Sequence, residues 1–187
     1  MPSDDQNMIL PLLRSSIPGS LLWDRFRAAE RPIFESLPGG LFVSYVFDDP
    51  SKYRFISRAI CDQMKIDPGQ LRQLAITNML RMNHDFLVNS LDPVYSIVKM
   101  NNHESSMILV DLFWDSPDLA AKYIQGDPIV AIPARDMLFF TGSSSQLGID
   151  TIGKMVDKVH SMKDGELLTK SLLIRQNSQW HEYHAKR

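Results

Sequence analysis

The spacing of hydrophobic and polar residues along the chain alternates between a pattern typical of strands and one typical of helices. Residues 41–49 (LFVSYVFDD) are rich in aromatic and β-branched side chains, which indicates a strand buried on both faces. Residues 53–57 (YRFIS) are expected to form its short partner strand. Residues 67–82 follow helical spacing, with Asp67 suited to the N-cap and Pro68 to the first helical position. We therefore expect a strand pair followed by a helix.

Three further pairs of apolar runs, each divided by a short polar segment, predict three antiparallel hairpins. The first spans residues 94–114 around NNHES, the second spans 129–140 around PARD, and the third spans 167–184 and turns at QNSQ. Helices are predicted between the hairpins at residues 116–124 and 143–162. Because strict strand–helix–strand alternation is lacking, the pattern predicts an α+β fold, with a mostly antiparallel sheet and three to four packed helices.

The N-terminal part of the chain carries weaker signals. Residues 1–7 are expected to be disordered, and residues 8–20, with two prolines and a glycine, are expected to run extended over a surface. A helix is predicted at residues 20–30, capped by Ser20. A chain of 187 residues without repeats or low-complexity linkers fits one domain, so we expect residues 8–187 to form a single α+β domain.

Composition and charge narrow the classes of function. The formal net charge is −2, which argues against an electrostatic nucleic-acid binder and gives no reason to expect an anionic membrane partner. No stretch approaches the roughly 18–20 consecutive apolar residues of a membrane span, and the N-terminus lacks the pattern of a secretory signal. Cys61 is the only cysteine, so an intrachain disulfide is impossible. These features predict a cytoplasmic protein, and a buried, inert thiol is favoured over a nucleophile at Cys61.

The motifs of common catalytic and cofactor sites are absent from the sequence. It contains no GxxxxGK or GxGxxG phosphate loop, no GxSxG elbow and no HExxH, and one cysteine cannot build a zinc site. His181 and His184 would align on a helix, but on the predicted strand they point to opposite faces. We therefore predict no cofactor and no metal site, and the sequence leans against an enzyme.

Two polar residues interrupt runs that are otherwise apolar. Asn78 lies within the apolar stripe of the helix at 67–82, where a buried amide must find partners or cost roughly 1–3 kcal/mol. It either ties the helix to a neighbouring segment or contacts a ligand. Asp111 interrupts ILVDLFW on the predicted strand, so it must be paired or protonated if both faces of that strand are covered. Both residues are candidates for a binding site, and scaffold roles remain open.

Three residues in the last two hairpins complete the candidate site. Arg135 is available as a partner for Asp111, and Asp136 is a second candidate partner for the same arginine. Turn chemistry explains an aspartate in PARD but does not require an arginine. Trp180, near the end of the third hairpin, either covers the core or forms part of a binding patch.

Five segments occur along the chain in a specific order: ILPLLR, LFVSYVFDDPSKYRFIS, LRQLAITNML, DPIVAIPARDMLFFTG and LLTKSLLIRQNSQWHEY. This order, over about residues 8–184, resembles the YtpQ-like family of bacterial proteins, a domain of unknown function. Seven residues match the family pattern: Asp48, Ala75, Asn78, Pro133, Arg135, Asp136 and Trp180. The chain departs from it where NML replaces the usual Asn-Leu pair and where LLTKSLL lacks a proline. The resemblance implies a bacterial cytoplasmic protein and assigns no activity.

Two classes of function follow from these observations. The first is a non-enzymatic module that binds another protein, for example an immunity protein that blocks a toxin. The second is a small-ligand-binding protein or enzyme in which Asn78, Asp111, Arg135 and Asp136 converge in one pocket. Neither class involves nucleic acid or a membrane, and the sequence specifies no oligomeric state.

Overall fold

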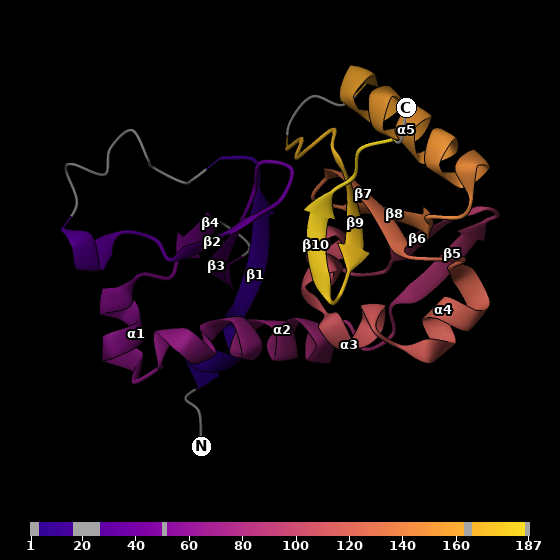
Figure 1. The fold of residues 1–187 in the computed structure, drawn as a ribbon. Helices are drawn as coiled ribbons and strands as arrows, with labels where there is room; N and C mark the ends of the chain where they lie inside the picture. Colours follow the sequence, from indigo (N-terminus) through magenta and orange to yellow (C-terminus); the bar gives the residue numbers. More distant parts are fainter. Residues whose placement is uncertain (1–3, 17–26, 50–51, 163–165, 186–187) are drawn as a thin grey trace.

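Two antiparallel β-sheets form the framework of the chain, and helices pack against both (Figure 1). The structure is a computed structural model that describes residues 4–16, 27–49, 52–162 and 166–185. The elements of the first part are η1 (Asp4–Met8), β1 (Ile9–Arg14), η3 (Ala28–Glu30), β2 (Phe34–Leu37), β3 (Leu41–Asp49), β4 (Lys52–Phe55), α1 (Arg58–Met64), η4 (Pro68–Gln70) and α2 (Leu71–Met82). Those of the second part are β5 (Leu87–Leu91), β6 (Val94–Val98), η5 (Glu104–Leu109), α3 (Asp111–Trp114), α4 (Pro117–Tyr123), β7 (Pro128–Ala134), β8 (Met137–Gly142), α5 (Gln146–Met162), β9 (Leu172–Gln176) and β10 (Gln179–Glu182).

The first sheet is built around β3, the apolar strand predicted at residues 41–49. β1 pairs antiparallel along one side of β3, while β2 and β4 pair with the other side. Val43 and Tyr45 of β3 are buried, and α2 covers β1 with a face that includes Leu71, Ala75 and Met79. The helical spacing of these apolar residues therefore sets which face of α2 meets the sheet.

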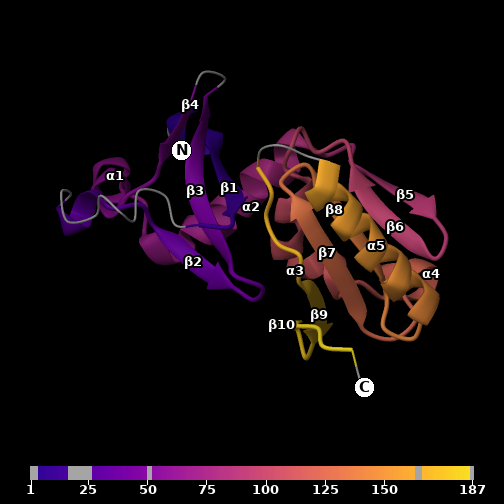
Figure 2. The ribbon, with the colours of Figure 1, turned by 90° about the horizontal axis from the view of Figure 1, so that it is seen from above.

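The second sheet has six strands in the order β10-β9-β7-β8-β6-β5, and each neighbouring pair is antiparallel. α5 lies across one face of this sheet, over β7 and β8 (Figure 2). Ile152 and Val156 of α5 pack against Val94 and Ala131 there. Because the sheet does not close on itself, β5 and β10 are left as edge strands.

One hydrophobic core joins the two sheets. Ile9 of β1 belongs to the same cluster of buried residues as Phe140 of β8. Every residue of η5 is buried, and the Ser106 hydroxyl of η5 donates to the carbonyl of Pro11 in β1 at 3.2 Å. The chain is thus an α+β single-domain fold, as predicted, although it has two sheets where one was expected.

Most of the predicted elements are confirmed. The strand at 41–49, the helix within 67–82, the hairpin at 129–140 and the long helix within 143–162 appear as β3, α2, β7–β8 and α5. The hairpin at the end of the chain is also present, as β9–β10. Local turn and cap chemistry drives these elements. Asp67, for example, accepts a hydrogen bond from the main-chain amide of Gly69 at 2.9 Å, as an N-cap should.

The predicted hairpin at residues 94–114 is wrong. Residues 94–98 are strand β6, but 104–109 form a 3-10 helix and 111–114 a short α-helix, and β6 pairs with β5 and β8. A continuous apolar run has no period to separate a buried strand from a buried helix. The run here is buried as a helix at the junction of the two sheets.

The N-terminal expectations differ from the structure in part. Residues 9–14 are extended, but they form β1, whose first five residues are buried, and do not run over a surface. Of the segment expected to be disordered, residues 4–7 lie in η1. Residues 1–3 and most of the helix expected at 20–30 lie outside the described residues. None of the described helices combines the length and apolar character that a bilayer crossing requires.

Candidate functional site

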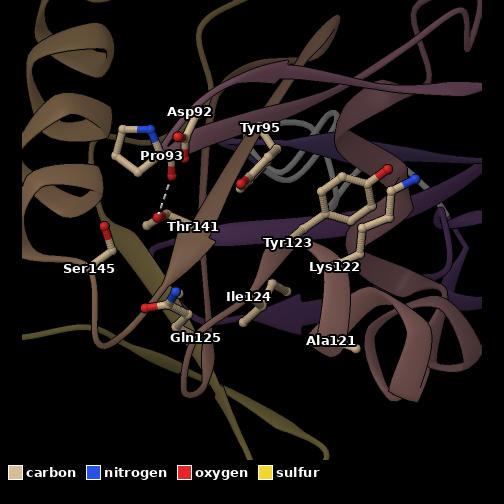
Figure 3. Close-up of a pocket in the computed structure, with 11 residues that line it drawn as sticks. Asp92, Pro93, Tyr95, Ala121, Lys122, Tyr123, Ile124, Gln125, Thr141 and Ser145 are labelled. Carbon is tan, nitrogen blue, oxygen red and sulfur yellow. Dashed lines mark hydrogen bonds between the residues drawn. The ribbon is translucent and has the colours of Figure 1, made fainter.

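A polar pocket with a volume of about 130 Å³ lies where β6, β8 and the segment joining α4 to β7 meet (Figure 3). Side chains from three separate parts of the chain point toward it. It is lined by Asp92, Pro93, Tyr95, Ala121, Lys122, Tyr123, Ile124, Gln125, Thr141, Gly142 and Ser145.

The pocket is held open by close contact between two stretches of backbone. A Cβ atom on Gly142, at the end of β8, would lie 2.2 Å from the carbonyl oxygen of Gln125, so only glycine fits there. The same carbonyl accepts a hydrogen bond from the Ser144 amide at 3.0 Å. Gly126 follows with a φ of +87°, a conformation that side chains disfavour. The segment before β7 is therefore fixed against the start of α5, and this contact shapes one side of the pocket.

Two hydroxyl groups on one side of the pocket are fixed by the backbone. Thr141 is buried and donates to the carbonyl of Pro93 at 2.8 Å, drawn as the dashed line in Figure 3. Its oxygen lone pairs can still accept a hydrogen bond. Ser145 accepts from the Gly148 amide at 3.2 Å, which leaves its own proton available to a ligand. The pair thus offers one acceptor and one donor.

Two tyrosines form the opposite wall. The rings of Tyr95 and Tyr123 meet edge to face, with centroids 5.0 Å apart, and the Lys122 ammonium lies 4.9 Å from the Tyr123 ring centre. Burial, followed by the charge and hydrogen bond of Asp92, raises the pKa of Tyr95. A tyrosine hydroxyl is protonated at neutral pH in any case, so Tyr95 can act as a hydrogen-bond donor.

The lining contains hydrogen-bonding groups and aromatic rings. Among the lining residues there is no cysteine or histidine, and Ser145 accepts a hydrogen bond from a main-chain amide. Within the described part of the chain, no group of three or more His, Cys, Asp or Glu side chains is placed to hold a metal ion. The groups that are present can hold a small molecule by hydrogen bonds and ring contacts.

Asn78, the first predicted site residue, lies away from this pocket. Its side-chain amide donates to the carbonyls of Gln6 at 2.7 Å and Ile9 at 3.0 Å, and the residue is buried. These bonds tie α2 to the start of β1. Both hydrogens of the Asn78 amide nitrogen are therefore used in hydrogen bonds that tie the helix to a neighbouring segment, one of the two roles considered for it.

Asp111 is not on a strand, and its partner is not Arg135. It is the first residue of α3, its side chain is 61% exposed, and its carboxylate lies 3.0 Å from Nη2 of Arg175. Arg175 of β9 is buried and binds Asp115 in a forked contact, with Nε–Oδ1 and Nη2–Oδ2 both at 2.9 Å. The expected pairing of Asp111 with Arg135 is therefore wrong: Asp111 is exposed and pairs with Arg175, a buried arginine that the sequence interpretation overlooked.

Arg135 and Asp136 occupy the turn between β7 and β8. Arg135 forms an ion pair with Glu166, and its carbonyl accepts from the Ser105 amide at 3.1 Å. Arg135 also lines a small cavity of about 70 Å³ together with Arg14. The turn is as predicted, and Arg135 fastens it to the segment that precedes β9.

Trp180 packs beside the Arg175 cluster. Its indole N–H donates to the carbonyl of Ile108 at 3.0 Å, and its ring meets Trp114 edge to face at 5.3 Å. The Arg175 guanidinium lies 5.4 Å from the Trp180 ring centre. Of the five predicted residues, Asp111 and Trp180 are therefore brought together around Arg175, while Asn78 and the Arg135–Asp136 turn lie at two other places.

The pocket itself was missed by sequence reasoning. Its lining comes from three segments with no shared motif. The signals that could have pointed to it are the Ser cap before α5 and the glycines at 126 and 142, which mark a turn and a close backbone approach.

The sequence of the chain is similar to those of uncharacterised bacterial proteins. A stretch of 118 residues, 62% of the chain, is 25% identical to a UPF0354 protein of Bacillus cytotoxicus. The identity is 24% to a UPF0354 protein of Bacillus mycoides and 23% to one of Bacillus cereus. In each case the match covers 43% of the relative, so the chain spans about two fifths of the length of these curated proteins. No family model and no solved structure matches the chain.

Proposed function

We propose that this chain, which is similar to uncharacterised UPF0354 proteins, binds a small, uncharged, hydroxyl-rich molecule such as a polyol or a monosaccharide. The observation that supports the proposal is the pocket in Figure 3, in which hydroxyl, amide and carboxylate groups from separate segments surround one space. Convergent polar groups over an aromatic wall are typical of small-molecule sites.

The charges around the pocket favour a neutral ligand. Asp92 and Lys122 contribute one negative and one positive charge, which cancel, and the remaining polar lining groups are neutral. Thr141 and Ser145 can accept and donate hydrogen bonds, as the hydroxyl groups of a polyol also do. The ring of Tyr123 supplies an apolar surface suited to the C–H face of a sugar. A volume of about 130 Å³ suits about one six-membered ring, since a cavity of roughly 150 Å³ holds benzene.

Calorimetric titration with a defined panel of compounds tests this proposal. The neutral probes are glycerol, inositol and glucose, and the charged comparators are acetate and ethylammonium. Asp92→Asn keeps the shape of the side chain but removes a charge-assisted acceptor, so we expect it to weaken binding of the neutral ligand by roughly 10- to 100-fold. Asp118→Asn, an exposed aspartate of α4 outside the lining, should leave the affinity unchanged.

The proposal is overturned if no neutral probe binds the unaltered chain saturably. It is also overturned if Asp92→Asn binds the best neutral probe as tightly as the unaltered chain does. Preference for a charged comparator would show that the two charges of the lining do not cancel in the site.

A second candidate function, a module that binds another protein, is favoured by a different observation. β5 is an edge strand whose residues Leu87 and Leu91 are 49% and 57% exposed, which is a surface suited to strand addition. The immunity-type role, membership of the YtpQ-like family and a cytoplasmic location stay predictions. So does a binding role for the Asp111 and Trp180 cluster.

Loss of binding upon substitution in β5 is the test of this second function. We expect Leu87→Lys or Leu91→Lys to abolish association with the protein partner, while Leu112→Lys, which alters an exposed leucine of α3, preserves it. A partner that binds all three variants equally would remove β5 from consideration.

A further inference from the structure

Two arginines, one from each sheet, line a second cavity that is separate from the pocket in Figure 3. Arg14 is the last residue of β1, and Arg135 lies in the turn between β7 and β8. The cavity has a volume of about 70 Å³. Ser15, Ser16 and Glu166 also line it and are exposed, so solvent reaches the cavity from their side.

Contacts between distant segments bring the two arginines together. The Ser15 hydroxyl donates to the carbonyl of Leu167 at 3.2 Å, which joins the end of β1 to the segment before β9. Leu167 in turn lies opposite Ala134 of β7 in an antiparallel β-bridge. The end of the first sheet is thereby fixed beside the β7–β8 turn of the second, and Arg14 and Arg135 face the same cavity.

Arg14 carries a buried hydrogen-bond donor that is not used. Its guanidinium lies 5.5 Å from the centre of the Phe55 ring, a contact that orients the group. Its Nε–H is buried and has no hydrogen-bond partner among the described residues, and none of their carboxylates forms an ion pair with it. Because buried polar groups are nearly always satisfied, this donor points to a partner that the described chain does not itself supply.

Glu166 occupies the place at Arg135 that an anion would take. Its carboxylate pairs with Nη2 of Arg135 and lines the same cavity. The arginine side chain is 15% exposed, whereas that of Glu166 is 56% exposed, so the glutamate can turn to water while the arginine stays. Ion pairs with an exposed member are weak, so a ligand can displace Glu166 readily. The lining then carries two positive charges.

We propose that this cavity binds a small oxyanion with two negative charges, either inorganic phosphate or the phosphate group of a small metabolite. Arg14 and Arg135 balance the two charges, and Glu166 moves to solvent when the anion binds. Guanidinium groups hold phosphate through paired, charge-assisted N–H···O bonds. The Ser16 hydroxyl at the open side can donate a further bond. The proposal does not depend on the neutral-ligand pocket.

Size and charge set the selectivity of the site. A cavity of roughly 150 Å³ holds the six carbons of benzene, so one of about 70 Å³ admits the oxyanion alone. The rest of a phosphorylated metabolite would extend into solvent past Ser15 and Ser16. A carboxylate with a single charge, such as acetate, would leave one arginine charge without a counter-charge. We therefore expect phosphate and sulfate to bind more tightly than acetate.

Calorimetric titration at constant ionic strength tests the proposal with four probes: phosphate, sulfate, glycerol phosphate and acetate. The dissociation constant of the best dianion should be about 1 mM or lower, which two charge-assisted hydrogen bonds can supply. Glycerol phosphate distinguishes the two sources of the anion. Tighter binding than that of inorganic phosphate identifies a phosphorylated metabolite, and weaker binding identifies the free ion.

Substitution of Arg14 assigns the binding to this cavity. Arg14→Gln should weaken dianion binding by about 10- to 100-fold, since it removes a charge and its hydrogen bonds. Arg54→Gln is the matched control. Arg54 of β4 also stacks on an aromatic ring, 4.2 Å from the centre of Phe47, but it is not among the described residues that line the cavity. Its removal should leave the affinity unchanged.

Glu166→Gln gives a readout that a purely structural role would not produce. It should raise the affinity for the dianion by about 2- to 10-fold, because the ligand no longer competes with a carboxylate for Arg135. A gain in affinity cannot result from a damaged fold. Circular dichroism spectra that match those of the unaltered chain would establish that each variant folds.

Four outcomes overturn the anion site. They are no saturable binding of phosphate or sulfate at millimolar concentration, binding of acetate as tight as that of the dianions, equal weakening by Arg14→Gln and Arg54→Gln, and an affinity that Glu166→Gln leaves unchanged.

Discussion

The carboxylates around Arg175 should contribute very unequally to stability. The comparison is between Asp115→Asn and Asp111→Asn, two substitutions of the same chemical kind against one buried arginine. Arg175 has a side chain that is only 3% exposed, whereas those of Asp115 and Asp111 are 45% and 61% exposed. The arginine, therefore, is the group that cannot return to water when a partner is lost.

The geometry sets the magnitude of each effect. Asp115 holds Nε and Nη2 of Arg175 in two bonds of 2.9 Å, and Nη1 has no hydrogen-bond partner among the described residues. Breaking a fully buried pair costs about 3–5 kcal/mol, and the partial exposure of Asp115 reduces this to about 2–4 kcal/mol. Asp111 makes a single contact from an exposed position, which resembles a surface pair and contributes about 0.2–1 kcal/mol.

Urea unfolding at pH 7, followed by tryptophan fluorescence, measures both free energies of unfolding. Asp118→Asn serves as the control for removal of an exposed negative charge. Equal losses for Asp111→Asn and Asp115→Asn would refute the reasoning, because they would show that neither burial of the arginine nor the forked geometry decides the energy.

The pH dependence supplies a second check. Hydrogen bonding from Arg175 lowers the pKa of Asp115 in the folded chain below its unfolded value of about 3.9. A depressed folded pKa contributes stability that is present above about pH 4 and is lost as the pH falls through the folded pKa. The gap in stability between the unaltered chain and Asp115→Asn should therefore narrow below pH 4, and a gap that is constant with pH would contradict this.

The remaining predictions concern single residues of the scaffold. Asn78→Leu should lower the free energy of unfolding by about 2–3 kcal/mol in urea titrations, because it removes both hydrogen bonds from the buried amide to main-chain carbonyls. Gly142→Ala should lower the melting temperature and abolish binding of the neutral ligand, since its Cβ would lie 2.2 Å from the Gln125 oxygen. Cys61 should resist a thiol reagent in the native state and react upon unfolding, because it is buried and burial raises the pKa of its thiol.

Elements whose signals are local could be predicted from the sequence. The cap at Asp67, the turn at 133–136 and the helical spacing within 143–162 depend on residues a few positions apart, and the structure has all three. The α+β class followed from their order. The run at 106–114 was misassigned because its burial comes from both sheets at once, which no local period records.

The candidate site was predicted less well because it depends on long-range partners. The expectation that Asp111 would pair with Arg135 required only an arginine in a nearby hairpin. In the structure, β9 lies beside β7, and this places Arg175 next to the start of α3. Arg135, at the turn of the neighbouring hairpin, instead meets Glu166. Arg135 thus pairs with Glu166, which is 31 positions away in the sequence. Asp111, its expected partner, pairs with Arg175, which is 64 positions away. Charge pairs of this kind follow from strand order, so they can be assigned only after the sheet is known.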